Sequence, residues 1–141
     1  SNHVVSYAMR PVDERLCRKT GHATGSAVHE LVRLRSGQGE PLMIETSYLP
    51  VKRFPSLDVE RLENGSLYDF LTAAYGFEIH NVRETLRPVM PLPQEKELLQ
   101  ITGTLPCILL ERFTHENGAC AEYTKSIVRG DKYIFSVELK K

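Results

Sequence analysis

The stretch Val28–Pro50 reads VHELVRLR, SGQGEP and LMIETSYLP, which is two strand-like runs on either side of a polar turn that contains glycine. This pattern predicts a β-hairpin. Successive side chains of a strand point to opposite faces, so Arg33 and Arg35 share one face. Two guanidinium groups side by side repel each other unless they point into water or share an anion. The pair therefore indicates either a solvated edge face or an anion site.

Composition describes an ordinary globular chain. Its 141 residues are enough for one domain with a real core, and 41% of them are hydrophobic against 26% charged. The 18 basic and 18 acidic residues give a net charge of zero, which argues against a chain that binds nucleic acid by itself. No apolar run approaches the roughly 20 residues that span a bilayer, and the N-terminus lacks a signal-peptide core. We therefore expect a cytoplasmic protein with no membrane partner.

Cysteine and histidine usage points away from disulfides and metals. Cys17, Cys107 and Cys120 contain no C-x-x-C pair, which indicates reduced thiols; a bridge between Cys107 and Cys120 is the weaker alternative. The five histidines lack metal-binding spacings, so we expect no metal site and no cofactor. Ser1 and Asn2 are interpreted as residues left by a removed tag.

An internal repeat organises the whole chain. Arg87-Pro88-Val89 repeats Arg10-Pro11-Val12 after 77 residues, and in both places a short helix, a glycine, a strand, a Gly-containing turn and a second strand follow. We expect strands at 3–9 and 77–89, short helices at 13–19 and 91–101, and a last strand over 132–139 with one face in the core. Two βαββ units related by a pseudo-twofold axis would form one antiparallel sheet with helices packed on it, an α+β fold.

The clearest helix, SLYDFLTAAY at 66–75, lies between the two units. Ser66 is the expected N-cap, and Leu67, Phe70, Leu71 and Ala74 form the stripe expected to face the core. A helix start favours an anion, and the Tyr68 hydroxyl would lie beside it. The alternative is a simple cap next to an exposed tyrosine.

Two glutamates occupy equivalent places in the repeat, because Glu122 follows Glu45 by 77 residues. Paired carboxylates can carry out acid/base chemistry, can accept hydrogen bonds from sugar hydroxyls or an amine, or can pair with the chain's own arginines, including Arg112 and Arg129. No nucleophile and base stand out together, so we expect no catalytic residue and no enzyme.

Ordered motifs across nearly the whole chain resemble the UTRA domain, the effector-binding half of bacterial GntR regulators of the HutC subfamily, which has a chorismate-lyase-like fold. The motifs are R-x-R at 33–35, Pro41, Glu45, SYLP at 47–50, FPSL at 54–57, SLY at 66–68, YG at 75–76 and EYTKSIVRGDKYIF at 122–135.

This resemblance implies a ligand site and a role. The ligand-binding residues would be Arg33, Arg35, Ser66 and Tyr68 around a phosphate, with Glu45 and Glu122 reading the hydroxyls or amine of a sugar. A tyrosine common in the family is replaced here by Val128, which bears on the identity of the sugar.

The expected function is that of a single ligand-sensing domain, residues 1–141, without the family's N-terminal winged helix-turn-helix. It would bind a small anionic metabolite, a sugar phosphate or amino-sugar phosphate, and work as a homodimer that reaches operator DNA only through the absent domain. Two alternatives are a chorismate-lyase-like enzyme that uses Glu122 as acid and a ligand-free dimerisation module.

Overall fold

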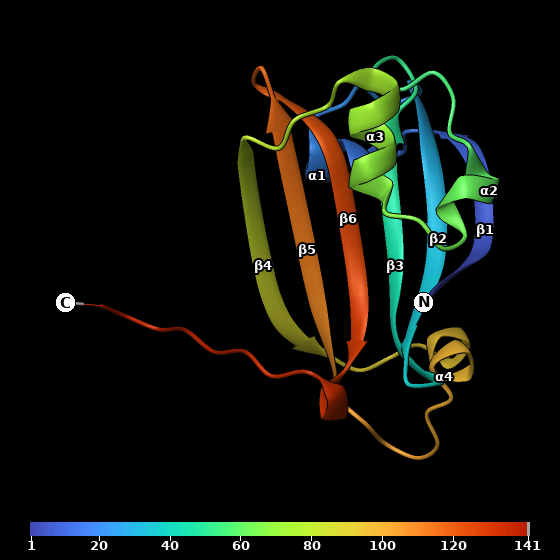
Figure 1. Ribbon diagram of the computed structural model, residues 1–141, viewed down its shortest axis with the longest axis vertical. Helices are drawn as coiled ribbons and strands as arrows, with labels where there is room; N and C mark the ends of the chain where they lie inside the picture. Colours follow the sequence, from blue (N-terminus) through green and yellow to red (C-terminus); the bar gives the residue numbers. More distant parts are fainter. Residues whose placement is uncertain (141) are drawn as a thin grey trace.

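The predicted hairpin is present as β2 (Ala27–Gly37) and β3 (Glu40–Pro50) in the computed structural model, which describes residues 1–140 (Figure 1). Its two connecting residues, Gln38 and Gly39, have φ of 53° and 79°. Two successive positive φ angles are what a type I′ turn requires, and this turn matches the twist of the strands it joins. The turn places Gly37 opposite Glu40, and a one-residue irregularity between Arg35 and Ser36 then brings Arg33 opposite Glu45.

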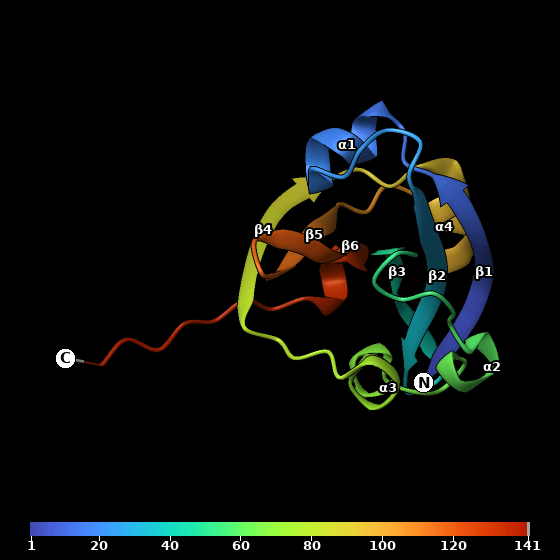
Figure 2. The same ribbon diagram turned by 90° about the horizontal axis from the view of Figure 1, so that it is seen from above.

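The two hairpins meet in one antiparallel sheet with the strand order β1-β2-β3-β6-β5-β4. The remaining strands are β1 (Asn2–Pro11), β4 (Asn81–Val89), β5 (Cys107–Glu116) and β6 (Ala119–Arg129). In Figure 2 the helix α1 lies on one side of this sheet and α3 on the other. The α+β class predicted from the sequence is confirmed.

The internal repeat is visible in the sheet. Each half runs strand, helix, strand, strand, and the two halves meet where β3 pairs with β6. Ser47 lies opposite Thr124 at this seam, and their hydroxyl oxygens are 2.8 Å apart. These two residues are 77 positions apart, the same offset that relates the two Arg-Pro-Val motifs. The pseudo-twofold axis therefore passes through the seam.

Capping residues set the helix ends. Asp13 accepts the N–H of Leu16 at the start of α1 (Glu14–Thr20), and Gly21 closes the helix with φ 79°. The other helices are α2 (Val59–Leu62), α3 (Leu67–Tyr75), α4 (Pro93–Leu99) and the 3₁₀ turn η1 (Gly130–Lys132). None of the helices within residues 1–140 is long and apolar enough to cross a membrane.

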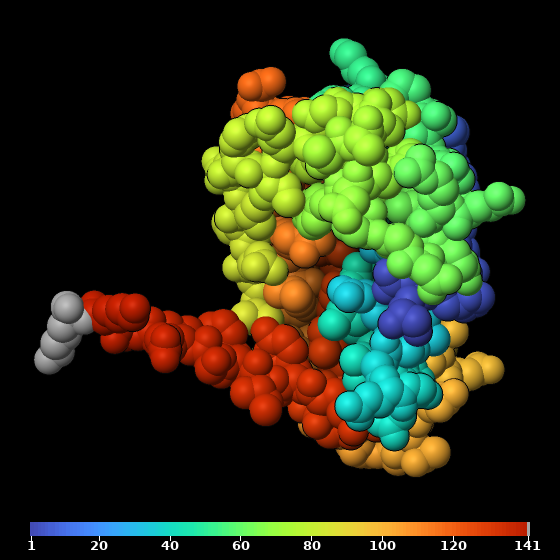
Figure 3. All heavy atoms as spheres, viewed as in Figure 1, coloured from blue at the N-terminus to red at the C-terminus, as the bar shows by residue number. Residues whose placement is uncertain are grey.

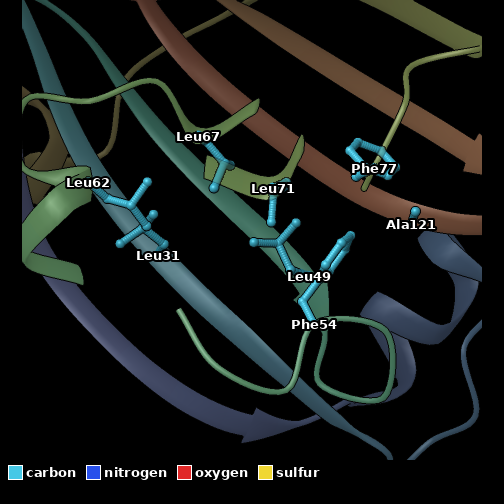
Figure 4. Packing of buried hydrophobic residues seen from close by; sticks show 8 residues of the cluster. All are labelled: Leu31, Leu49, Phe54, Leu62, Leu67, Leu71, Phe77 and Ala121. Atoms are coloured by element: carbon cyan, nitrogen blue, oxygen red, sulfur yellow. The ribbon is translucent and has the colours of Figure 1, made fainter. Parts of the chain in front are cut away.

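Three apolar clusters hold the helices to the sheet. One packs Leu16 of α1 against Phe113, Cys120 and Tyr123, and the other two have more buried members. The larger one packs α2 and α3 against β2, β3 and β6, and Figure 4 shows its eight buried members: Leu31, Leu49, Phe54, Leu62, Leu67, Leu71, Phe77 and Ala121. The smaller one, around Ile44 and Leu99, lies on the other face beneath α4. Burial of this apolar surface is the main favourable term in folding, so α3 is held firmly over the centre of the sheet.

Three expectations from the sequence need correction. The strand expected over 132–139 is absent: residues 133–140 run as an extended arm, exposed from 134 onward, because no strand within residues 1–140 lies beside them to share hydrogen bonds. The strand expected from 77 begins only at Asn81, since Phe77 is fully buried in the α3 cluster. Ala74, expected in the core stripe of the helix, is exposed in the last turn of α3.

Candidate functional site

A cavity of about 380 Å³ opens on the α3 face of the sheet. It lies between the start of α3 and strands β1, β2, β3 and β5, and Figure 3 shows a hollow bordered by the blue N-terminal residues, the green α2–α3 segment and the orange β5. Its lining residues are Asn2, Arg33, Arg35, Glu45, Asn64, Gly65, Ser66, Leu67, Tyr68 and Arg112. Five of the six ligand-binding residues expected from the sequence are in this set, and the sixth, Glu122, contacts Tyr68 directly.

The two arginines of β2 share one carboxylate. Arg33 donates from Nη2 to Glu45 Oε2 at 3.4 Å, and Arg35 donates from Nη1 to Glu45 Oε1 at 3.0 Å. Arg33 is buried and also donates to the carbonyl of Gly65 at 3.1 Å, whereas half of the Arg35 side chain (51%) is exposed. Arg33 is therefore fixed in place, and Arg35 has room to move toward a ligand.

The second glutamate is the centre of a buried network. Glu122 is fully buried, and its Oε1 accepts from Tyr68 Oη at 2.8 Å and from Thr114 Oγ1 at 2.7 Å. Its Oε2 accepts from Thr124 Oγ1 and from Arg112 Nη2. The expected alternative of an exposed tyrosine is thus wrong for Tyr68, whose hydroxyl ties α3 to β6.

Arg112 completes the site, although it was not among the ligand-binding residues expected from the sequence. It donates to Glu122 at 3.4 Å, and its guanidinium carbon lies 4.9 Å from the centre of the Tyr68 ring, a cation–π contact. The signal was available in the sequence, because Arg112 follows Arg35 by the repeat offset of 77. The pairs Arg35–Glu45 and Arg112–Glu122 are equivalent members of the two halves.

The start of α3 contributes a cap and a rim to the cavity. Ser66 Oγ accepts the N–H of Asp69 at 3.2 Å, so the expected N-cap is confirmed. Ser66 itself is exposed and lines the cavity. The free N–H groups of this first turn and the positive end of the helix dipole face the same space as the arginines.

The charges of the site perturb one another. Burial lowers the pKa of Arg33, and the neighbouring Arg35 adds to this effect while Glu45 opposes it. Burial alone would also lower the pKa of Arg112, but the charges of Glu122 and Tyr68 outweigh this effect, and the pKa of Arg112 is raised. Burial and then the Glu122 charge raise the pKa of Tyr68. Arg33 and Arg112 remain cations and Tyr68 remains a neutral donor at physiological pH.

Two buried polar atoms at this cavity have no hydrogen-bond partner within residues 1–140, Asn2 Oδ1 and Arg112 Nε. Both belong to residues that line the cavity, and no other buried side-chain oxygen or nitrogen of the described chain lacks a partner. A buried group without a partner costs about 1–3 kcal/mol, so such groups mark places where a further molecule can bind.

Of the three roles considered for Glu45 and Glu122, the structure shows pairing with the chain's own arginines. Both accept hydrogen bonds from arginines, Glu45 from Arg33 and Arg35, and Glu122 from Arg112. The expected pairing with Arg129 is not found; Arg129 pairs with Asp131 instead. Within residues 1–140, no group of three His, Cys, Asp or Glu side chains is placed to hold a metal ion.

Comparison with known proteins shows the family of this chain. The model of the UTRA domain matches residues 1–134. The transcriptional repressor NagR of Bacillus subtilis is 27% identical over 135 residues, which cover 95% of this chain and 55% of that protein. The mannosyl-D-glycerate transport/metabolism system repressor MngR of Escherichia coli is 25% identical over 139 residues, 96% of this chain and 57% of that protein. The chain spans about half the length of these curated relatives.

Solved structures of GntR-family regulators have the same fold as this chain. The crystal structure of the effector domain of PhnF from Mycobacterium smegmatis superposes with a TM-score of 0.88 at 25% identity, over 99% of this chain and 86% of that one. The two chains therefore share one fold. The chain belongs to the UTRA domain family and has the fold of the effector-binding domains of GntR-type transcriptional regulators.

Proposed function

We propose that this domain senses a small metabolite that carries an anionic group and several hydroxyl or amine groups, in the simplest case a sugar phosphate or amino-sugar phosphate. Binding would control a winged helix-turn-helix domain in the full-length regulator. The observation that carries the proposal is the convergence of three arginines, Glu45 and the start of α3 on one cavity, whose lining residues include the two that carry buried polar atoms without a partner.

The balance of charge favours an anion. Three arginines and two glutamates leave one positive charge in excess around the cavity, to which the α3 dipole adds. A phosphate offers three acceptor oxygens that guanidinium groups can hold in pairs. Because Glu45 already accepts from Arg33 and Arg35, an entering anion would take over part of these hydrogen bonds. The half-exposed Arg35 is the group best able to turn toward the anion.

The binding free energy of a micromolar ligand requires contacts to its anionic group and to its hydroxyl or amine groups. Hydrogen bonds to a charged group contribute roughly 1.5–3 kcal/mol each, so three or four give on the order of 6–10 kcal/mol before costs. A micromolar ligand needs about 8.2 kcal/mol net, after the entropy lost on association. Contacts from Glu45 to hydroxyls or an amine would supply the remainder, with the buried Glu122 holding Tyr68 and Arg112 in place beside the ligand. The relative MngR is named for mannosyl-D-glycerate, a sugar joined to an acid, which is the same combination of groups.

The same site argues for sensing rather than catalysis. Glu122 is fully buried and surrounded by four donors, so it has no free position from which to act as an acid on a substrate. A ligand that binds one state of a regulator better than the other shifts the equilibrium by that difference, typically 1–3 kcal/mol. The cytoplasm is where such a regulator would meet DNA and metabolites.

A thermal-shift panel tests the proposal on this chain. The panel contains hexose 6-phosphates, hexosamine 6-phosphates, their unphosphorylated forms, inorganic phosphate, a phosphonate and urocanate. A ligand at 100 times its dissociation constant stabilises the native state by about 2.7 kcal/mol, a clear shift of the melting temperature. We expect phosphorylated sugars to stabilise the chain. Arg35→Gln should reduce this stabilisation by about half or more, and Arg18→Gln, a matched change on the exposed surface of α1, should leave it unchanged. Stabilisation by a carboxylate alone would refute the phosphate assignment.

A further inference from the structure

A second cavity lies on the opposite face of the sheet, beneath α1, and is called the α1 cavity below. Its volume is about 260 Å³, against about 380 Å³ for the cavity on the α3 face, and no residue lines both. Along β2, Glu30 lines the α1 cavity and Arg33 the other; along β3, Tyr48 and Glu45 do the same. Each pair is three positions apart, so its members point to opposite faces of the sheet. Figure 2 shows α1 and α3 on these two sides.

The internal repeat shows how unusual the α1 cavity is. The equivalent helix in the second half, α4, covers the sheet with apolar side chains: its Leu99 is fully buried and packs in one cluster with Ile44. In α1 no residue is buried, and Leu16 packs only partly buried against the cluster of Phe113 and Tyr123. The space beneath α1 is therefore left to charged and aromatic side chains.

Two ion pairs account for part of the charge around the α1 cavity. Arg10 donates from Nη1 to Glu30 Oε1 at 2.9 Å, which links β1 to β2. Lys19 of α1 lies 3.0 Å from Glu111 of β5, which holds the end of the helix to the sheet. These four residues form the rim and leave the other cations of the cavity uncompensated.

Arg15 and Lys125 line the α1 cavity without a partner. Among residues 1–140, neither side chain takes part in a hydrogen bond or an ion pair, although both are lining residues. Lys125 is only partly exposed. Burial and then the charge of Arg15 lower the pKa of Lys125, and nearby glutamates offset this only in part. A partly buried ammonium group without a partner is destabilised, and an anion beside it would remove this cost.

The charge balance fits an anion with a single charge. Four cations line the α1 cavity, and the carboxylates are Asp13 and Glu30 in the lining and Glu111 bound to Lys19. Four positive and three negative charges leave an excess of one. A phosphate group carries about 1.5–2 negative charges at pH 7, more than this excess, whereas a carboxylate carries one.

The remaining walls of the α1 cavity are apolar. The rings of Tyr48 and Tyr123 stack with their centres 5.7 Å apart and their planes 13° apart, and Pro11 and Leu16 also line the space. The Tyr123 hydroxyl donates to Glu111 at 2.6 Å, so its proton is not free for a ligand. What these residues offer is apolar and aromatic surface, which suits the body of a hydrophobic ligand.

We propose that the α1 cavity binds a small monocarboxylate with an aromatic or aliphatic body, its carboxylate between Arg15 and Lys125 and its body against the two tyrosine rings. A guanidinium group can hold a carboxylate with two parallel hydrogen bonds, and an ammonium group adds a point charge beside it. The inference goes beyond the sugar-phosphate proposal and does not depend on it, because the two cavities share no residue. A regulator with both sites would receive two chemical signals through one sheet.

Titration with benzoate, followed by two-dimensional ¹H–¹⁵N NMR, tests the site on this chain. We expect saturable shifts of the amides of α1, Tyr48 and Lys125, and no such shifts with benzamide, the uncharged analogue. Arg15→Gln and Lys125→Met should each lower the affinity for benzoate about tenfold or more, because each removes a charge-assisted contact. Arg18→Gln, the matched change on the same helix but outside the cavity, should leave the affinity unchanged. Since Arg15 is exposed, its variant tests the site even if Lys125→Met does not fold.

Four outcomes of this titration would overturn the proposal: no saturation at millimolar benzoate, equal shifts with benzamide, unchanged affinity in Arg15→Gln, or displacement of benzoate by inorganic phosphate. Shifts confined to the start of α3 would place benzoate in the other cavity. That result would refute the second site and leave the sugar-phosphate proposal standing.

Chemical labelling of lysine gives an independent readout. With limiting acetic anhydride and peptide mass spectrometry, we expect saturating benzoate to slow the acetylation of Lys125 at least twofold, because a bound carboxylate covers the amine and favours its protonated form. Lys52, which is exposed and lies outside the α1 cavity, is the control and should react at an unchanged rate. Equal rates at Lys125 with and without benzoate, or equal slowing at both lysines, would contradict a specific site.

Discussion

Removal of one oxygen atom from Tyr68 is expected to loosen α3 from the sheet. In Tyr68→Phe, Glu122 loses the donor at 2.8 Å but keeps Thr114, Thr124 and Arg112, so its charge is not left without partners. The cost is therefore that of one hydrogen bond to a charged group, about 1.5–3 kcal/mol, and not the 3–5 kcal/mol that follows when a buried charge loses its only partner. For a chain of this size we expect a fall in melting temperature of about 5–10 °C.

The assay is reversible urea unfolding followed by circular dichroism, with melting curves as a second probe. Tyr75→Phe is the control, because it deletes the same atom from an exposed hydroxyl at the end of α3, which donates to the carbonyl of Ser56 at 2.6 Å and accepts the N–H of Ser56 at 2.9 Å but contacts no charged group. We expect about 1 kcal/mol or less for the control. A loss below about 0.5 kcal/mol for Tyr68→Phe would show that the remaining three donors hold Glu122 equally well and would refute the network as drawn.

Three further changes have expected outcomes. Arg35→Gln should lower the affinity for a stabilising sugar phosphate roughly 10- to 150-fold, measured by calorimetry, because one hydrogen bond to a charged group is lost. The same change should alter the free energy of unfolding by less than about 1 kcal/mol, since this arginine is half exposed. Gly130→Ala should lower the melting temperature, because a Cβ would lie 2.1 Å from the carbonyl oxygen of Pro106. Burial raises the pKa of the Cys120 thiol to about 11, from an ordinary value of 9.0, so the folded state holds this proton more tightly. The resulting stability is complete below pH 9 and is lost as the pH rises toward 11, so the urea midpoint should fall less steeply over this range in Cys120→Ala.

The parts of the fold that depend on local chemistry were predictable. The Gly-containing turns, the Ser66 cap and the 77-residue repeat each follow from a few neighbouring residues, and the structure confirms all three. The arm at 133–140 was not predictable in the same way. Its alternating pattern describes a strand correctly, but a strand needs a neighbour, and the sequence of one chain does not state where that neighbour is.

In the candidate site, too, the residues set by local sequence were predictable and the contacts set by tertiary packing were not. The R-x-R pair on β2 was found because strand geometry alone places two arginines on one face. Glu122 and Tyr68 were expected near a ligand, but their bond to each other depends on how α3 docks on β6, which is a matter of tertiary packing. Arg112 was not expected as a ligand residue, although it occupies the position in the second half of the repeat that Arg35 occupies in the first. Asn2, read as part of a tag remnant, lies in β1 and lines the cavity.

The seam between β3 and β6 also has a consequence for protein synthesis. The ribosome releases β1, α1, β2 and β3 well before β6, whose Thr124 lies 77 residues after its partner Ser47. Until then the nascent half-sheet carries an open edge at β3, in the middle of the finished protein. Closing so long a loop is slow compared with forming either hairpin, and an open edge of this kind can pair with another nascent chain. Chains stalled before residue 119 should therefore depend on chaperones far more than the completed domain.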